Sequence, residues 1–188
     1  MPQEQVGFTV WLTGLSGAGK TTLAIALEEA LRARGLRRVE RLDGDTVREG
    51  LSRDLGFSRE DRDKNIERVT FVARLLARND VAVIAAFISP YRHARDAARS
   101  QIAHFVEVHV AASLETCMAR DTKGLYARAI AGEIPHFTGI SDPYEAPLAP
   151  EVVVQQEPET VEQSLARVLL ALEARGLIPQ AQPAAEAL

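Results

Sequence analysis

The sequence predicts an α/β domain with a central, mostly parallel sheet of five strands. Short apolar or β-prone runs alternate along the chain with longer segments whose apolar residues recur at helical spacing. One run, residues 81–88, is apolar throughout, as in a parallel strand covered on both faces. The chain has 188 residues, 46% hydrophobic and 26% charged, so we expect 1–188 to form one domain with a substantial core.

The first third of the chain shows this alternation from its start. Residues 8–13 form a β-prone run that ends at a glycine, which predicts a buried strand. Residues 21–34 carry leucines at helical spacing and are followed by Gly35, which predicts a helix and its end. Residues 39–42 predict a second, short strand that runs into Asp43-Gly-Asp45.

The next helix is marked by its cap. Ser58-Arg-Glu-Asp61 has the pattern of a capping box, in which the serine caps backbone N–H groups and the acid reaches back. The helix that follows has an apolar stripe with a period of 3.6 residues, made of Ile66, Val69, Val72, Ala73 and Leu76.

The remaining elements complete the sheet. After the strand at 81–88, residues 105–110 and 151–154 predict a fourth and a fifth strand, and residues 160–163 open a last amphipathic helix that ends near Gly176. Residues 120–150 are rich in glycine and proline and have weak periodicity, which predicts a lid over about 120–148. The low-complexity tail, residues 179–188, is expected to be frayed.

A phosphate-binding loop lies between the first strand and the first helix. Gly14-Leu-Ser-Gly-Ala-Gly-Lys20-Thr21 satisfies G-x-x-x-x-G-K-[ST] at every fixed position. Glycines let successive N–H groups point at phosphate oxygens, and the following helix adds its positive end. Lys20 can reach the terminal phosphates, and the Thr21 hydroxyl can ligate Mg²⁺. The sequence therefore predicts a P-loop, kinase-like three-layer sandwich that binds a nucleoside triphosphate.

Other classes of P-loop protein do not fit the sequence. A GTPase uses Asn-Lys-x-Asp to select its base, and that motif is absent; Asp121-Thr-Lys-Gly124 matches D-x-x-G but follows a helix-like segment. A mechanical ATPase has an acid at the end of its hydrophobic strand, whereas the run 81–88 is followed by Ser89-Pro90. Among these classes of P-loop protein, the sequence therefore favours a small-molecule kinase.

The acid that such a kinase needs is available in Asp43-Gly-Asp45, which in a parallel sheet lies beside the phosphate loop. Two aspartates one residue apart project differently. We expect Asp43 to orient Mg²⁺ and Asp45 to accept a hydrogen bond, and then a proton, from the acceptor hydroxyl. The structural alternative is a turn that caps a helix from Thr46 onward.

Composition excludes several function classes. The net charge of −4 gives no support to a nucleic-acid-coating role, although local arginines can hold an anionic substrate. No apolar run is long enough to span a membrane, and the start has no signal-peptide layout, so we expect a cytoplasmic protein. The single cysteine, Cys117, cannot form an intrachain disulfide, and the four histidines have no zinc-like spacing.

The chain resembles the adenylylsulfate kinase (APS kinase) family over about residues 8–154. The family's motifs occur in order, the most specific being Phe87-Ile-Ser-Pro90, Phe137-Thr-Gly-Ile140 and Asp142-Pro-Tyr-Glu-Ala-Pro147. The family transfers the γ-phosphoryl group of ATP to the 3′-hydroxyl of adenosine 5′-phosphosulfate (APS), which gives 3′-phosphoadenylyl sulfate (PAPS). The resemblance thus implies ATP and Mg²⁺ as cofactors and APS as the substrate. Two departures from the family pattern, Thr46 and Glu49, replace the usual Asn and His.

The resemblance also implies a set of site residues. ATP is expected at Gly14, Leu15, Ser16, Gly17, Ala18, Gly19, Lys20, Thr21 and Thr22, and Mg²⁺ at Thr21 and Asp43. APS is expected at Asp43, Asp45, Arg48, Phe57, Arg62, Asn65, Ile88, Ser89, Lys123, Leu125 and Phe137. The catalytic set is Lys20, Asp45 and Ser89.

Within this set, Phe57 and Phe137 would sandwich the adenine of APS. Arg48 and Arg62 would hold the phosphosulfate, and Lys123 would come from the lid. The family is commonly described with a phosphoserine at the position of Ser89. No base for that hydroxyl is evident in the nearby sequence, and we favour direct in-line transfer.

The resemblance further implies a homodimer and leaves room for contact with a separate sulfate adenylyltransferase chain. Two alternatives stay open at this point. One is another P-loop kinase that acts on a nucleoside monophosphate or a sugar. The other is a catalytically idle nucleotide-binding regulator, or a subunit that binds the adenylyltransferase.

Overall fold

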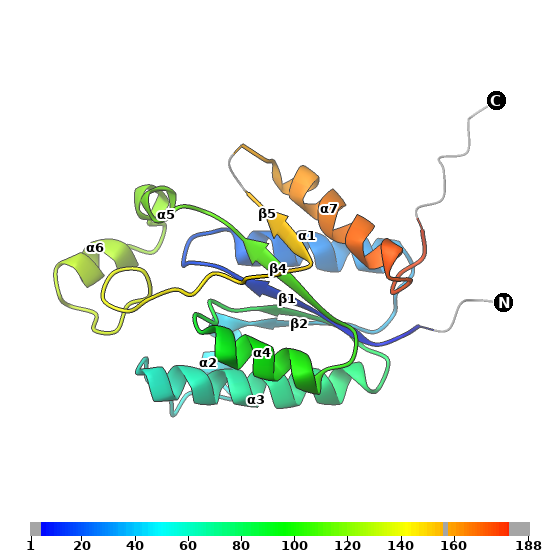
Figure 1. Ribbon diagram of the computed structural model, residues 1–188, viewed down its shortest axis with the longest axis horizontal. Helices are drawn as coiled ribbons and strands as arrows, with labels where there is room; N and C mark the ends of the chain where they lie inside the picture. The colour runs from blue at the N-terminus through cyan, green and yellow to red at the C-terminus, as the bar shows by residue number, and fades with distance from the viewer. Residues whose placement is uncertain (1–4, 156–157, 181–188) are drawn as a thin grey trace.

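A parallel sheet forms the centre of the protein (Figure 1). The computed structural model describes residues 5–155 and 158–180, and within them the sheet has five strands in the order β2-β3-β1-β4-β5. All four neighbouring pairs are parallel, which confirms the predicted α/β class. The strands are β1 (Phe8–Thr13), β2 (Val39–Asp43), β3 (Ala82–Ala86), β4 (Phe105–Val110) and β5 (Val152–Val154).

Helices cover both faces of the sheet and make three layers (Figure 1). Helices α1 (Lys20–Ala33) and α7 (Val161–Ala174) pack on one face, and α3 (Arg59–Ala77) and α4 (Arg92–Gln101) pack on the other. Successive side chains of a strand point to opposite faces. Accordingly, Leu12 of β1 joins the core under α1 and α7, while the neighbouring Trp11 joins the core under α3 and α4.

Three short helices complete the fold: α2 (Gly44–Glu49), α5 (Leu114–Arg120) and α6 (Leu125–Ile130). Helices α5 and α6 lie beyond the carboxyl ends of the strands (Figure 1). The sequence did not predict α4 or α6 as helices, and it offered a helix from Thr46 onward, which overlaps α2, only as an alternative. Helix α6 falls inside residues 120–148, which we call the lid segment, so this segment is more regular than its weak periodicity indicated.

The helix caps show which local predictions hold. At α7, the Thr160 hydroxyl accepts from the Gln163 amide and the Gln163 side chain accepts from the Thr160 amide, a complete capping box. At α3, the Ser58 hydroxyl accepts from the Asp61 amide at 3.1 Å. The acid does not reach back to Ser58, because the Asp61 carboxylate accepts from the Gly56 amide at 3.0 Å instead, so the second half of that predicted box is wrong.

The run at 81–88 is strand only over Ala82–Ala86. The chain leaves the sheet after that and turns at Ser89, whose φ of 38° lies in the left-handed region. Helix α7 ends just before Gly176, as predicted. Most of the predicted frayed tail, residues 181–188, lies outside the described residues. None of the helices in the described ranges is long and apolar enough to cross a membrane.

Candidate active site

The predicted phosphate loop joins the end of β1 to the start of α1. Gly14 is packed so closely that a Cβ there would lie 2.5 Å from the Val110 carbonyl oxygen, and Gly19 has a φ of 98°. Only glycine tolerates both the close packing at the first position and the positive φ at the second without strain. The Lys20 side chain is buried, and its Nζ donates to the carbonyl oxygens of Gly14 at 2.9 Å and Leu15 at 2.7 Å. The ammonium group is therefore held at the mouth of the loop.

The surroundings of Lys20 set its protonation. Burial lowers the pKa of Lys20 to about 8, and the neighbouring Asp43 and Asp45 only partly oppose this effect. The ammonium form, which triphosphate binding requires, is thus present at pH 7 and is lost as the pH rises through 8. Binding of a triphosphate beside Lys20 favours the charged form, so binding above pH 8 must take up a proton.

This linkage gives a testable pH dependence. If only the ammonium form binds, we expect the Kd of ATP with Mg²⁺ to rise about tenfold between pH 7 and pH 9. Titration calorimetry at pH 9, in buffers of different ionisation enthalpy, should show close to one proton taken up per ATP. Lys20→Met is the control, because it lacks the titrating group. Equal proton uptake in both proteins would contradict the assignment.

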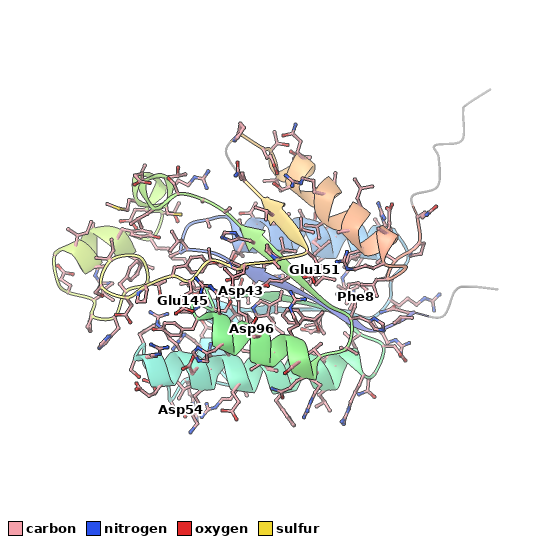
Figure 2. All side chains as sticks on the ribbon, in the orientation of Figure 1. Phe8, Asp43, Asp54, Asp96, Glu145 and Glu151 are labelled. Atoms are coloured by element: carbon pink, nitrogen blue, oxygen red, sulfur yellow. The ribbon has the colours of Figure 1, made fainter. Side chains whose placement is uncertain are left out.

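Asp43 ends β2 and faces the loop. Its carboxylate is buried; Oδ2 accepts from the Thr21 hydroxyl at 3.0 Å, and Oδ1 accepts from the Asp45 amide at 3.1 Å. The second contact caps α2, so the helix-cap alternative for Asp43 is confirmed, with the helix beginning at Gly44 and not at Thr46. Figure 2 shows Asp43 toward the end of the sheet that is nearer the lid segment. A carboxylate and a hydroxyl beside a triphosphate are hard oxygen donors of the kind that Mg²⁺ prefers.

Asp45, two residues on, projects differently, as the sequence predicts. Its side chain is 75% exposed, and its Oδ2 lies 2.5 Å from Nζ of Lys123 in the lid segment. Asp43 is thus turned to the phosphate loop and Asp45 to the lid. The sequence expected both Asp45 and Lys123 in the site but did not predict that they pair.

Two arginines flank an exposed aromatic ring. The Arg48 guanidinium lies 4.3 Å from the centroid of the Phe57 ring, and that of Arg62 lies 5.5 Å away. Phe57 is 51% exposed, which is high for a ring of this size. Arg62 is buried, and it donates to the carbonyl oxygens of Phe57 at 3.0 Å and His136 at 2.6 Å. These contacts tie the start of α3 to the lid segment.

The floor of the site comes from α3 and the turn after β3. Asn65 is 6% exposed, and its Oδ1 has no hydrogen-bond partner among the described residues. The Ile88 carbonyl accepts from the Thr13 hydroxyl at 2.7 Å. The Ser89 hydroxyl is buried and accepts from the Trp11 indole at 3.1 Å. Ser89 is therefore in the site, but its hydroxyl is bonded to the core.

The lid segment supplies the remaining predicted residues. Leu125 begins α6, and the next residue, Tyr126, donates its hydroxyl to the Ser16 carbonyl of the phosphate loop at 2.9 Å. Phe137 is only 8% exposed and packs edge to face against Tyr126, with ring centroids 5.0 Å apart. Phe137 thus belongs to the core as well as to the wall of the site, whereas the Phe57 ring is exposed.

One cavity of about 760 Å³ brings most of these residues together. Of the predicted residues, only Gly14, Leu15 and Ala18 do not line it. The sequence missed several lining residues. Most come from the lid segment: Arg120, Asp121, Thr122, Tyr126, Arg128, Ile134, His136 and Thr138. The others come from α2, α3 and the end of β3 with the turn after it: Gly44, Ile66, Ala86, Phe87 and Pro90. For some of them there was a signal: Lys123-Gly-Leu-Tyr126 is a further stretch that resembles the family, and Phe87, Pro90 and Thr138 stand in the motifs Phe87–Pro90 and Phe137–Ile140. The remaining lid-segment residues lack periodicity that could have marked them.

Comparison with known proteins gives consistent matches. The family model "Adenylylsulphate kinase" matches residues 6–155. A probable adenylyl-sulfate kinase of Pseudomonas aeruginosa is 63% identical over 88% of this chain and 77% of its own length. A probable bifunctional SAT/APS kinase of Sorangium cellulosum is 56% identical over 93% of this chain, which corresponds to 30% of that protein. The Mycobacterium tuberculosis APS kinase structure in complex with AMPPNP and APS has a TM-score of 0.86 and 42% identity, and covers 90% of this chain and 99% of that one.

Proposed function

This chain belongs to the adenylylsulphate kinase family, and we propose that the cavity between its phosphate loop and its lid segment is the active site. The protein is an ATP-dependent phosphotransferase that makes PAPS from APS and uses Mg²⁺. A single observation supports the location: one cavity is lined both by the loop residues Lys20 and Thr21 and by the acceptor residues Asp45, Arg48 and Phe57.

The donor half of the site is the phosphate loop. Its N–H groups and the start of α1 bind the β- and γ-phosphates, and Lys20 moves from the Gly14 and Leu15 carbonyls onto them. Mg²⁺, when bound, would supply positive charge that offsets the negative charge of the phosphates. Thr21 and Asp43 are the residues that would hold it, because their oxygens already lie 3.0 Å apart beside the loop.

The acceptor half binds APS across the cavity. The exposed Phe57 ring offers a flat face for the adenine, with Phe137 as the second wall. Arg48 and Arg62 supply two guanidinium groups for the phosphosulfate, and Asn65 offers an amide whose oxygen has no partner in the described protein. Ile88, Ser89 and Leu125 line the same space.

Asp45 is the group that accepts the proton of the 3′-hydroxyl. Its carboxylate is exposed to the cavity and is held there by Lys123. A hydroxyl that enters can replace Lys123 as the hydrogen-bond donor. Lys123 is then free to approach the phosphosulfate or the transferring phosphoryl group as the lid segment closes. Closure also keeps water away from the γ-phosphoryl group.

Ser89→Ala tests whether transfer is direct. The Ser89 hydroxyl is bonded to Trp11 inside the core, so we expect kcat to stay within about tenfold of wild type, whereas loss of an obligatory nucleophile costs on the order of 10⁴-fold or more. The free energy of unfolding should fall by about 1–3 kcal/mol, because the indole N–H loses its partner. Steady-state assays and thermal unfolding measure the two effects. Loss of turnover in a folded variant would support a phosphoserine intermediate.

The activity is tested by an acceptor series. Purified protein with ATP and Mg²⁺ is given APS, AMP or a sugar, and PAPS and ADP are quantified. We expect rapid phosphorylation of APS and at most trace activity with the others. Preference for AMP or a sugar would indicate another P-loop kinase. Normal ATP binding without turnover of any acceptor would indicate a nucleotide-binding regulator.

We also propose two kinds of partner and a cellular location for the protein. Two exposed apolar side chains one turn apart on α3, Phe71 at 56% and Leu75 at 37%, support self-association as a homodimer, which analytical ultracentrifugation tests. The fusion named for the Sorangium relative supports contact with a separate sulfate adenylyltransferase, which would supply APS. A cytoplasmic location fits a chain whose one cysteine, Cys117, is buried and not in a disulfide.

A further inference from the structure

Residues 144–146, which we call the lid root, are fastened to the start of α4. The Glu145 amide donates to the Pro90 carbonyl at 2.8 Å, and the Glu145 carboxylate accepts from the Arg92 amide at 2.8 Å. The Arg92 side chain donates to the Ala146 carbonyl at 2.9 Å. Figure 2 shows Glu145 toward the same end of the sheet as Asp43. This part of the Asp142–Pro147 motif therefore anchors the lid segment and does not line the cavity.

Arg95 connects the lid root to the rest of the site. Its side chain is 2% exposed and donates in three directions: to the Glu145 carbonyl at 2.6 Å, to the Ser89 carbonyl at 2.6 Å and to the Glu107 carboxylate at 2.8 Å. Glu107 on β4 supplies the opposite charge that a buried guanidinium needs. Only the planar fork of arginine can serve three acceptors in this way.

The Ser89 turn is held by two contacts, one to the side-chain hydroxyl of Ser89 and one to its carbonyl oxygen. Its left-handed φ of 38° is one that residues other than glycine rarely adopt, so the surroundings must fix it. Trp11 binds the hydroxyl and Arg95 binds the carbonyl oxygen. Ser89 lines the cavity, whereas Arg95 and Trp11 do not. Arg95 thus acts on the site through Ser89.

The lid root also determines where Phe137 lies. Between them the chain forms a compact turn, in which the Phe137 carbonyl accepts from the amides of Ile140, Ser141 and Asp142. A shift of the lid root would therefore move Phe137. It would also move the neighbouring His136 carbonyl, which binds Arg62.

We propose that Arg95 is a positioning residue for the phosphoryl acceptor. It holds the Ser89 turn and the lid root at a fixed separation. It thereby fixes Ser89 directly and Phe137 through the lid root, and these two residues form two walls of the APS half of the cavity. The phosphate loop receives no hydrogen bond from Arg95. Loss of the hydrogen bonds from Arg95 to Ser89 and the lid root should therefore weaken APS binding and leave ATP binding unchanged. This inference rests on the proposed function, because APS is the ligand whose KM it concerns.

Arg99 offers a matched control on the same helix. It lies one turn further along α4 and shares Glu107, at 3.1 Å. Its other bonds go to Glu151, which precedes β5, and not to Ser89 or the lid root. Arg95, Arg99 and Glu107 form one charge network. If only this network mattered, substitution of Arg95 and substitution of Arg99 should therefore have the same effect.

Arg95→Lys and Arg99→Lys are compared for KM of APS, kcat and Kd of ATP. We expect Arg95→Lys to raise the KM of APS about tenfold or more with the Kd of ATP within twofold, and Arg99→Lys to change neither. Wild-type PAPS formation, measured first, tests the proposed function separately. An unchanged KM in folded Arg95→Lys, or an equal rise in both variants, would overturn the proposal.

Trp11 provides a second readout, since it is the only tryptophan and bonds directly to Ser89. Its emission spectrum should shift in Arg95→Lys and not in Arg99→Lys, which a merely structural role would not require. If Arg95→Lys does not fold, Glu107→Gln loosens Arg95 while keeping an acceptor. Its KM for APS should then rise about threefold or more against an unchanged Kd of ATP, and no rise would overturn the proposal.

Discussion

Lys20→Ala is expected to abolish PAPS formation, with kcat/KM lower by on the order of 10³-fold or more. Lys20 is the only lysine at the phosphate loop; the other two, Lys64 and Lys123, lie on α3 and in the lid segment. Its buried ammonium group is held beside the loop by the Gly14 and Leu15 carbonyls, from which it moves onto the phosphates to offset the charge that develops on the γ-phosphoryl group. A charge in a water-excluded site acts more strongly than one in solvent.

The measurement is PAPS formation at saturating ATP and APS, together with thermal unfolding to show that the variant folds. Lys64→Ala is the matched control, because Lys64 is exposed and does not line the cavity. It should keep wild-type kcat. Turnover within tenfold of wild type in Lys20→Ala would show that the loop does not hold the transferring phosphate as described.

Asp45→Asn should lower kcat by about 10²-fold or more while the Kd of ATP stays near the wild-type value. The amide keeps the size of the side chain but cannot take the proton of the 3′-hydroxyl. ATP binding should persist, because the contact between Thr21 and Asp43 does not involve the Asp45 side chain. Stability should change little, since the ion pair to Lys123 is solvent-exposed.

Pre-steady-state and steady-state kinetics with APS measure this effect. Glu49→Gln is the control, because it removes an exposed carboxylate from the same short helix. Near-normal kcat in Asp45→Asn would mean that another group, or water, accepts the proton. A loss of ATP affinity equal to the loss of kcat would instead assign Asp45 to the nucleotide side.

Those parts of the fold that carry strong local signals could be predicted from the sequence. Strands β1, β3, β4 and β5 and helices α1, α3 and α7 bury continuous or periodic apolar residues, which is the signal that periodicity detects. Helix α4 buries only Ala94, Arg95 and Ala98, so it has no stripe of large apolar side chains. Helices α2 and α6 have six residues each, too few for a period to show.

The candidate site, like the fold, has parts that local sequence patterns predict and parts that they do not. The phosphate loop and Asp43-Gly-Asp45 are local patterns with a physical reason for each residue, and the structure brings them together as expected. Arginines could not be chosen from the sequence, because 19 of the 22 basic residues are arginine. Contacts such as Lys123 with Asp45, or Arg95 with Ser89, join residues far apart in the chain. Only the tertiary structure shows them.

A crystal structure with a non-hydrolysable ATP analogue, Mg²⁺ and APS would test most directly whether donor and acceptor meet in this cavity. We predict the γ-phosphate on the Gly14–Thr21 loop, the purine of APS against Phe57, and the ribose 3′-hydroxyl in line with the transferred group and hydrogen-bonded to Asp45. A 3′-hydroxyl out of line with the donor, or APS bound away from Phe57 and Asp45, would contradict this assignment.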